Sequence, residues 1–444
     1  MSGFSFFCSP RPSESANHGG NSMADVLNAN RSILVAGGGM SGLSAALEAA
    51  EAGIPVCLVE REPYLGGRVA RMNKYFPKLC PPSCGLEINF RRIRNNPLIR
   101  VFTMAEVEKI AGEAGNFDVT IKVAPRYVNE KCTGCGLCSE AASTAVPDAF
   151  NYGLQTVRAA YLPHEFAFPM RYVVAPEVIG TPEAEAIKAA CPYGAVELDM
   201  QPATFDLNVG AIVWATGWQP YDATGIRYCG VGKHRNVITN VVMERLASPG
   251  GPTGGRITRP SDGVEAKKIA FVQCAGSRDE NHLPYCSGVC CLASLKQATY
   301  LLERHENASA TIFYIDIRAL GKYESFFTTV RSDPRVNLIK GKPGEISEDP
   351  ETGMVTVQVE DQATGGIVKD QFDLVVLAVG MVPSCAVETP PAQLALDEHG
   401  FVLDEQPVPG IVGAGCARKP VDVASSVQDA TAAALKAIQA TCRR

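Results

Sequence analysis

The feature that most constrains this chain is a strand, glycine loop, helix and second strand over residues 32–60 (SILVAGGGMSGLSAALEAAEAGIPVCLVE). The loop carries the motif G-x-G-x-x-G, formed by Gly37, Gly39 and Gly42. In such a unit the first glycine makes the tight turn, the second lets the backbone approach a pyrophosphate, and the third packs the helix on the strand. Glu60 ends the second strand, where a carboxylate can accept a ribose 2′-OH. The pattern predicts a dinucleotide site at a helix N-terminus.

Three other segments are expected to meet the same dinucleotide. A Gly-Gly-Arg step at 66–68 allows a second close backbone approach and supplies a cation, and residues 205–217 (FDLNVGAIVWATG) indicate a buried strand that ends in Ala-Thr-Gly. The segment 408–440 indicates a strand, a Gly-Ala-Gly turn and an Ala-rich helix from about Val423. The start of that helix is expected to face a flavin ring, and an ordinary packing helix is the alternative. The residues predicted to bind the cofactor, FAD, are Gly37, Gly39, Met40, Ser41, Gly42, Glu60, Arg61, Gly67, Arg68, Val107, Ala215, Thr216, Gly217, Gly415, Cys416 and Val423.

An internal duplication indicates two related α/β domains. Residues 372–382 (FDLVVLAVGMV) closely echo 205–217, and between them 268–277 and 310–316 are predicted as strands around a helix over 292–304. The predicted organisation is a disordered N-terminus at 1–30, an FAD domain in three parts (31–125, 203–260 and 371–444), an inserted ferredoxin-like module at 126–202, and a second α/β domain at 261–370.

The insert carries a cysteine pattern that is incomplete in an informative way. Cys132, Cys135 and Cys138 form C-x2-C-x2-C, but the fourth cysteine of a two-run ferredoxin pattern is replaced by Ala142. A second run that ends at Cys191 would need cysteines at 181, 184 and 187, where Thr, Ala and Ile stand. Because the fourth cysteine of each run ligates the other cluster, these losses leave one complete [4Fe–4S] site and remove the other. Zinc is the alternative, although zinc favours paired C-x2-C knuckles.

A second cysteine set stands where a disulfide reductase would carry its second nucleotide motif. Cys274, Cys286, Cys290 and Cys291 give C-x11-C-x3-C-C, and the turn at 272–277 (VQCAGS) lacks the glycine pattern. Four thiolates at a strand end and a helix start can hold an iron–sulfur cluster. A redox-active Cys290–Cys291 pair and unrelated buried cysteines are the alternatives.

A third candidate is the pair Cys80 and Cys84, separated by Pro-Pro-Ser. The pair follows the Gly-Gly step, roughly where flavin disulfide reductases keep their redox thiols, and the two prolines make a stiff turn. We therefore take Cys80 and Cys84 as candidate catalytic thiols. A structural turn with inert thiols is the alternative.

From residue 32 to the C-terminus the chain resembles the heterodisulfide reductase A family. That family pairs FAD with a [4Fe–4S] site at Cys…Tyr-Cys-Ser-x-x-Cys-Cys, and here the motif is 274–291 (CAGSRDENHLPYCSGVCC). Within the family, 75–97 (YFPKLCPPSCGLEINFRRIRNNP) and 159–172 (AAYLPHEFAFPMRY) resemble the A component of quinone-interacting membrane-bound oxidoreductase (Qmo) complexes. The resemblance implies a flavoprotein of the thioredoxin and glutathione reductase type with FAD and two [4Fe–4S] clusters.

The same resemblance implies partners and a location. The expected partners are Qmo subunits B and C, the latter a membrane protein that handles quinone, and adenylylsulfate reductase. The chain would lie in the cytoplasm at the inner face of the membrane, held there by its partner subunits. A soluble sulfur-oxidising protein of the heterodisulfide reductase type, and an NAD(P)H-dependent disulfide reductase that uses Cys80 and Cys84, are the alternatives.

Composition supports this interpretation. A net charge of −6 argues against nucleic acid as a partner, and no apolar run is long enough to span a bilayer. Residues 1–30 lack the apolar core of a secretory leader, and most of the sixteen cysteines are clustered. Clustered cysteines in a chain that is not exported are expected to be metal or redox ligands rather than disulfides.

Overall fold

The computed structural model describes residues 31–76, 78–391 and 394–442. The disorder expected for residues 1–30 lies outside these ranges. None of the helices in the described ranges combines the length and hydropathy of a membrane span.

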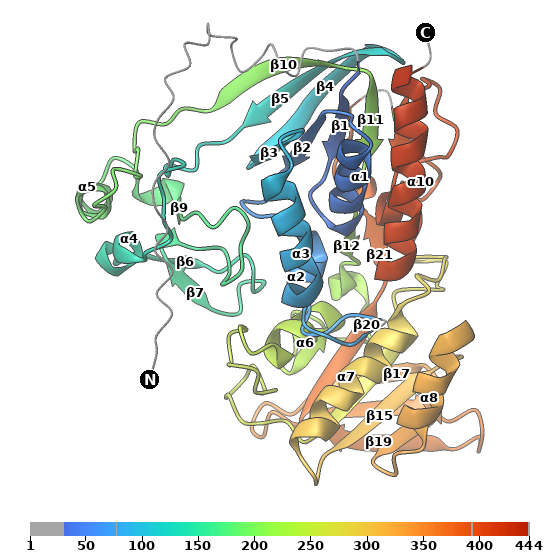
Figure 1. Cartoon of the computed structure of the whole chain (residues 1–444). Helices are drawn as coiled ribbons and strands as arrows, with labels where there is room; N and C mark the ends of the chain where they lie inside the picture. The colour runs from blue at the N-terminus through green and yellow to red at the C-terminus, as the bar shows by residue number, and fades with distance from the viewer. Residues whose placement is uncertain (1–30, 77, 392–393, 443–444) are drawn as a thin grey trace, which may run out of the picture.

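The first structural unit is built on a five-stranded parallel sheet, shown in the upper part of Figure 1. Its strand order is β22 (Ile411–Gly413), β11 (Ala211–Trp214), β1 (Ile33–Ala36), β2 (Val56–Glu60) and β3 (Ile99–Thr103). The central strands are buried on both faces, as expected for a parallel sheet with a layer on each side. Alternate residues therefore belong to different cores: Ile33 and Val35 pack toward the helices, and Leu34 packs toward the opposite layer.

The two covering layers differ in kind. One face carries the helices α1 (Met40–Glu51), α3 (Pro82–Asn95) and α10 (Val423–Cys442). The other carries an antiparallel sheet of β10 (Ala203–Val209), β5 (Asn116–Val123) and β4 (Ala105–Glu113). β4 is not among the strands predicted from the sequence, because it has only two buried positions and its polar residues give a weak alternating pattern.

The second unit repeats this architecture below the first (Figure 1). Its parallel sheet has the order β13 (Val237–Thr239), β20 (Leu374–Val379), β14 (Lys268–Ala275), β15 (Ser309–Tyr314) and β16 (Val336–Lys340). The helices α6 (Asn240–Ala247), α7 (Cys290–Arg304) and α8 (Glu324–Arg331) cover one face, and the antiparallel strands β17 (Pro343–Glu348), β18 (Val355–Glu360) and β19 (Ile367–Phe372) cover the other. The predicted duplication is confirmed by this shared strand order.

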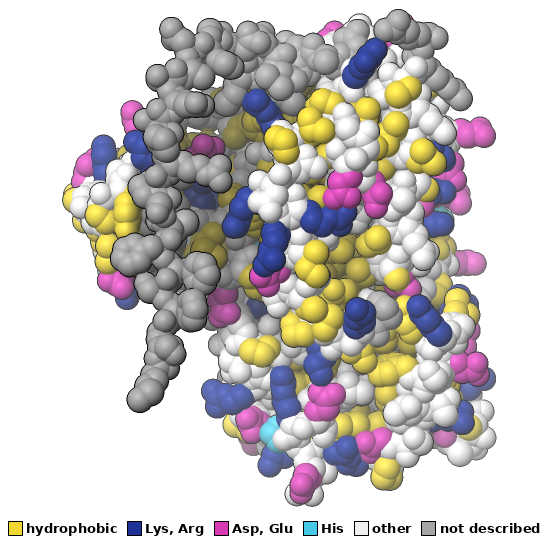
Figure 2. Space-filling view, viewed as in Figure 1, with side chains coloured by type: hydrophobic (Ala, Val, Ile, Leu, Met, Phe, Trp, Pro, Cys, Tyr) yellow, Lys and Arg dark blue, Asp and Glu magenta, His cyan; other side chains and the backbone are white. Residues whose placement is uncertain are grey.

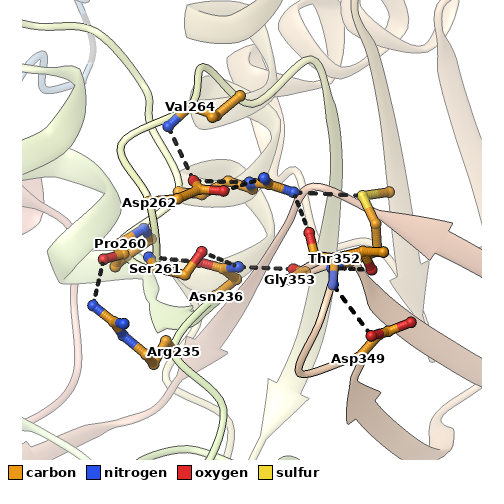
Figure 3. Close-up of polar contacts among 11 residues, drawn as sticks. Arg235, Asn236, Pro260, Ser261, Asp262, Val264, Asp349, Thr352 and Gly353 are labelled. Carbon is orange, nitrogen blue, oxygen red and sulfur yellow. Dashed lines mark hydrogen bonds and ion pairs between the residues drawn. The ribbon is translucent and has the colours of Figure 1, made fainter.

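Two predicted domain boundaries are wrong, because β13 and β20 both belong to the second sheet. The segment before residue 261 is tied to the second unit by hydrogen bonds as well. Asn236 donates its side-chain amide to Ser261 Oγ (2.8 Å) and to the Gly353 carbonyl (2.7 Å) in the polar cluster of Figure 3. The second unit therefore includes residues 237–260 and 374–379, which local sequence patterns assigned to the FAD domain.

The insert lies between two strands that pair with each other. β5 ends at Val123 and its antiparallel neighbour β10 begins at Ala203, whereas β18 and β19 of the second unit are joined by a short turn. The inserted segment has its own core and contains α4 (Leu137–Ala141), α5 (Pro182–Ala189), η1 (Pro176–Val178) and the short strands β6 (Ala145–Pro147), β7 (Thr156–Arg158), β8 (Ala160–Tyr161) and β9 (Val173–Val174).

Smaller elements complete the chain. β12 (Trp218–Pro220) pairs antiparallel with β21 (Met381–Pro383), so the ends of the two echoing segments lie side by side. The remaining elements are α2 (Gly67–Ala70), α9 (Ser384–Val387), η2 (Ala223–Gly225), η3 (Gly321–Tyr323) and η4 (Gly415–Ala417).

Candidate flavin pocket and cysteine centres

A cavity of about 890 Å³ extends from the glycine loop of the first unit to α6 and α7 of the second. This volume lies within the range of ordinary cofactor and ligand pockets. On the face drawn in Figure 2, hydrophobic side chains gather in the middle of the molecule, where the two units meet. The cavity is the natural place for the predicted dinucleotide.

The glycine loop has the geometry that the motif predicts. Gly37 has φ +106°, and an added Cβ there would stand 2.4 Å from the Ala215 carbonyl oxygen. At Gly42 an added Cβ would stand 1.7 Å from the Gly37 carbonyl oxygen, so the helix contacts the turn directly. Gly39 lines the cavity, and the nearest heavy atom to a Cβ added there would be Gly67 Cα at 3.9 Å. The loop therefore leaves backbone open to the cavity where a pyrophosphate would approach, which fits FAD.

The Gly-Gly step makes its close approach to this loop. The Gly66 N–H donates to the Gly38 carbonyl (2.8 Å), and a Cβ on Gly67 would stand 2.9 Å from Gly39 Cα. Gly67 lines the cavity beside Gly39. The second close approach predicted from sequence is therefore a contact between the two glycine segments, which together form one wall.

Glu60 lies at the end of β2 on the cavity wall. Its carboxylate accepts hydrogen bonds from the backbone N–H groups of Gly38 (2.6 Å) and Glu62 (2.8 Å). Burial raises the pKa of Glu60 to about 7, and these two hydrogen bonds only partly oppose that rise. The side chain stands where the dinucleotide motif requires an acid.

We expect a Glu60→Gln variant to have a flatter dependence of stability on pH. The pKa of Glu60 is about 7 in the folded chain against an ordinary value of 4.5. Because the folded value is higher, its contribution to stability is complete below pH 4.5 and is lost as the pH rises through 7. Above that range the buried carboxylate costs about 3 kcal/mol, which glutamine avoids. Thermal unfolding of both proteins from pH 5 to pH 8 checks this, and parallel curves would contradict it.

Most of the other predicted cofactor residues also line the cavity. These are Met40, Ser41, Arg61, Arg68, Val107, Ala215, Thr216, Gly217, Cys416 and Val423. Gly42 and Gly415 do not. Gly42 packs the helix on the turn, and a Cβ on Gly415 would stand 1.9 Å from Ser41 Oγ, so both act behind the wall.

Arg68 is held away from a simple ion-pairing role. Its guanidinium donates to the Trp218 carbonyl (2.5 Å), to the Gln219 side chain and to the Tyr152 hydroxyl (3.2 Å), and it lies over the Trp218 ring. Arg68 therefore joins the first unit to β12 and to the insert, in addition to lining the cavity.

The second set of cysteines is gathered beside this cavity. Cys274 ends β14, Cys290 and Cys291 begin α7, and Cys286 lies on the loop between them. Burial first, and then the neighbouring thiols, raise the pKa of Cys274 to about 11, so the four thiols lie within electrostatic reach of one another. Gly288 and Val289, between Cys286 and Cys290, line the cavity. The loop that carries Cys286 therefore reaches the same cavity as the glycine loop.

The first set is gathered within the insert. Cys132, Cys135, Cys138 and Cys191 surround a small cavity of their own. Burial opposes ionisation of Cys191, but hydrogen bonds from backbone N–H groups at 193–196 outweigh it and lower the pKa of that thiol. The Ala195 N–H donates to Cys191 Sγ at 3.3 Å. Such N–H to sulfur bonds are typical of iron–sulfur ligands.

The spacing of the thiols distinguishes between kinds of metal centre. Among the described residues, no three His, Cys, Asp or Glu side chains converge closely enough to hold a single metal ion. A zinc site requires four ligands around one ion, whereas each cysteine of a [4Fe–4S] cluster binds a different iron. The four cysteines of the insert line one small cavity, which is the arrangement that a cluster requires.

Comparison with known proteins agrees with this geometry. Residues 32–76 match the FAD dependent oxidoreductase family. The chain is 39% identical over 420 residues to the iron-sulfur protein A 2 of CoB–CoM heterodisulfide reductase from Methanopyrus kandleri, which covers 92% of this chain and 64% of that protein. It is 35% identical over 427 residues to the A protein of H2:CoB-CoM heterodisulfide,ferredoxin reductase from Methanothermobacter marburgensis, covering 93% and 64%.

The homologues of this chain are heterodisulfide reductase A proteins. The chain spans 64% of the length of these relatives. Among solved structures it is similar to thioredoxin reductase of T. acidophilum, with a TM-score of 0.52, 15% identity, and coverage of 93% of this chain and 98% of that one. The solved structure confirms the predicted α/β fold of the thioredoxin reductase type.

This heterodisulfide reductase A homologue also has a buried ion pair that sequence reasoning missed. Lys296 Nζ lies 3.0 Å from Glu244 Oε1, and both side chains line the flavin cavity. The Asn73 N–H donates to the same carboxylate (2.9 Å), and Lys296 donates to the Lys74 carbonyl (2.5 Å). The pair therefore links the two units. In the sequence Lys296 looks like an ordinary residue of a mostly apolar helix, and no sequence pattern indicates that it pairs with Glu244.

We expect Glu244→Gln to lower the free energy of unfolding by about 3–5 kcal/mol, because it leaves a buried ammonium without its counter-charge. The double variant Glu244→Gln, Lys296→Met should lose less. Glu51→Gln is the matched control, because it breaks the exposed Arg92–Glu51 pair (2.8 Å) and should cost at most about 1 kcal/mol. Denaturant unfolding of the holoprotein measures all three. Equal losses at the buried and exposed pairs would contradict the expectation.

The remaining predicted thiols of this homologue, Cys80 and Cys84, do not line the flavin cavity. Cys80 is half-buried and Cys84 is exposed in the first turn of α3. The stiff turn expected from the prolines is present, since Pro82 begins the helix and the Cys84 N–H donates to the Pro81 carbonyl (3.1 Å). Tyr75 does line the cavity, and its phenol makes a hydrogen bond with the Cys80 thiol.

Proposed function

We propose that this chain is an FAD- and iron–sulfur-containing electron-transfer subunit of the heterodisulfide reductase A type, with one FAD and two [4Fe–4S] clusters. Within that type we propose a Qmo complex. There the chain would pass electrons between a quinone pool, reached through subunits B and C, and adenylylsulfate reductase. It would be peripheral to the inner face of the membrane through those partners.

One observation carries the proposal: residues 288 and 289, which lie between Cys286 and Cys290, line the same cavity as the G-x-G-x-x-G loop. Flavin is the cofactor that converts two-electron into one-electron chemistry, and iron–sulfur clusters carry single electrons. A flavin site with cysteines beside it, in place of a second nucleotide motif, supports electron transfer rather than pyridine-nucleotide oxidation.

The residues of the chain would have separate tasks. Gly37, Gly39 and Gly67 leave the backbone open to a pyrophosphate, and the start of α10 at Val423 lines the same cavity. The buried thiols of Cys274 and Cys290 are costly to ionise without a cation beside them. Cluster irons held by Cys274, Cys286, Cys290 and Cys291 would supply that charge. The set at Cys132, Cys135, Cys138 and Cys191, in a ferredoxin-like insert, would hold the second cluster near the surface, where Cys135 is exposed.

The test is the iron, acid-labile sulfide and flavin content of protein purified without oxygen. We expect about eight iron atoms, about eight sulfides and one FAD per chain. Zinc in place of iron, or a chain that lacks flavin, would overturn the proposal. Addition of NADH to the same sample should leave the flavin absorbance unchanged, and bleaching would favour the NAD(P)H-dependent disulfide reductase.

The choice of a Qmo complex rests on the segments 75–97 and 159–172 and needs its own experiment. A tagged chain should co-purify from detergent-solubilised membranes with a quinone-binding membrane protein, and a quinol analogue should reduce its flavin in that complex. Recovery entirely in the soluble fraction, without such a partner, would instead favour the soluble sulfur-oxidising protein of the heterodisulfide reductase type.

A further inference from the structure

Cys80 and Cys84 differ from the other described cysteines outside the two sets. Cys57, Cys229, Cys385 and Cys416 are buried at separate places, and Cys442 is exposed near the end of α10. Cys80 and Cys84, in contrast, flank one short turn, and both can be reached from solvent. Two thiols four residues apart at a surface are candidates for a disulfide, which an isolated thiol is not.

The local backbone is held in a defined shape. The Tyr75 N–H donates to the Cys80 carbonyl (3.2 Å), and the Leu79 N–H donates to the Tyr75 carbonyl (2.9 Å). Pro81 precedes α3 and Pro82 begins it, which fixes φ at two consecutive positions between the thiols. These hydrogen bonds and the two prolines fix the backbone on either side of Cys80.

Tyr75 joins this turn to the flavin cavity. A Cβ on Gly85 would stand 2.4 Å from Tyr75 Oη, so the phenol rests directly on the first turn of α3. The phenol makes a hydrogen bond with the Cys80 thiol and lies within electrostatic reach of Cys84; burial first, and then these thiols, raise the pKa of Tyr75. The same side chain lines the cavity. A change in the charge or bonding of either thiol must therefore alter the hydrogen bonding of a cavity residue.

We propose that Cys80 and Cys84 form a thiol pair that exchanges with small disulfides and communicates with the flavin cavity through Tyr75. The exposed Cys84 thiolate attacks one sulfur of a disulfide R–S–S–R, which breaks the S–S bond and releases R–S⁻. The Cys80 thiolate then attacks Cys84 Sγ, releases the second R–S⁻ and closes the Cys80–Cys84 disulfide. Two electrons pass from the pair to the incoming disulfide, and no flavin or cluster takes part. The thiol exchange is therefore independent of the proposed function, whereas the communication with the cavity rests on the proposed flavin.

The experiment uses the anaerobic holoprotein, with glutathione disulfide as the probe. After an acid quench, alkylation and trypsin digestion, both cysteines lie in one peptide, 79–91 (LCPPSCGLEINFR), because Lys78 and Arg91 flank it. We expect the wild-type peptide to carry no alkyl group and to weigh two hydrogens less than the reduced, unalkylated peptide. We expect Cys80→Ser to carry one glutathione on Cys84, and Cys84→Ser to react at least about tenfold more slowly, because Cys80 is less accessible.

Cys442, which is exposed but isolated, is the internal control and should form only a mixed disulfide. If both cysteines of 79–91 remain alkylated at a probe concentration that modifies Cys442, the thiol pair is overturned. Loss of iron from the Cys80→Ser, Cys84→Ser double variant would also overturn it, since the thiols would then be cluster ligands.

The link to the cavity has a separate readout. We expect oxidation of the pair to shift the flavin absorption band in the wild type, and we expect this shift to be lost in Tyr75→Phe while the disulfide still forms in peptide 79–91. An unchanged flavin spectrum in the wild type after complete oxidation would overturn the communication. If the purified chain contains no flavin, the proposed function fails, whereas the peptide measurement still decides the thiol chemistry.

Discussion

A Cys290→Ala variant is expected to lose about half of its iron and sulfide and to keep its FAD. Cys290 is buried at the first position of α7, and its thiol lies within electrostatic reach of Cys274, Cys286 and Cys291. Removal of one ligand from a four-cysteine site should release about four irons of about eight. The FAD should remain, because the glycine loop and β2 lie in the other unit.

The matched control is Cys229→Ala, which removes a buried cysteine of the same unit that belongs to neither cysteine set. Its iron and flavin content should equal that of the wild type. Iron and sulfide analysis and the flavin absorbance measure all three proteins. Full iron retention in Cys290→Ala would remove the cluster from 274–291 and with it the observation on which the proposed function depends.

Gly42→Ala is expected to abolish FAD binding and to destabilise the first unit. The new methyl group would stand 1.7 Å from the Gly37 carbonyl oxygen, so either α1 or the glycine turn must move. Such overpacking costs on the order of 1–3 kcal/mol or more, and it displaces the backbone that faces the phosphates. Flavin content after purification and the melting temperature measure the effect.

Gly344→Ala is the control for this substitution, because a Cβ at Gly344 meets no heavy atom within 4 Å. It should bind one FAD and melt within a few degrees of the wild type. A Gly42→Ala protein that binds FAD as well as the control would show that the helix can shift without cost, and the motif would then lose its structural interpretation.

The dinucleotide half of the site could be predicted because its determinants are local. Gly37, Gly39, Gly42 and Glu60 lie within 24 consecutive residues, and each role follows from backbone geometry that any strand–turn–helix unit must satisfy. The structure assigns the turn, the open backbone and the helix packing to the same three glycines. The duplication was also visible, since equivalent strands at 205–217 and 372–382 carry the same buried runs.

Other elements could not be predicted because their signals are weak or their partners distant. β4 has two buried positions among nine, too few to distinguish a strand from a loop. β13 is three residues long, and it belongs to the sheet because it pairs in parallel with β20, which lies more than 130 residues later in the chain. Glu244 and Lys296 looked like ordinary helix residues, and their pairing depends on how α6 and α7 pack.

The cysteines show where the division lies. By itself the sequence predicted the set at Cys132, Cys135, Cys138 and Cys191, because ligand spacing within a run is a local property of the chain. The set at 274–291 was implied by the family resemblance. Only the tertiary structure decided where the cysteines lie relative to the cavity. The packing of the two duplicated units brings residues 288–289 to the same cavity as the glycine loop. Cys80 and Cys84 do not line that cavity and contact it only through Tyr75. The reason is that ligand spacing depends on residues close together in the sequence. Which residues line a cavity depends instead on the burial of apolar surface between segments far apart in the sequence.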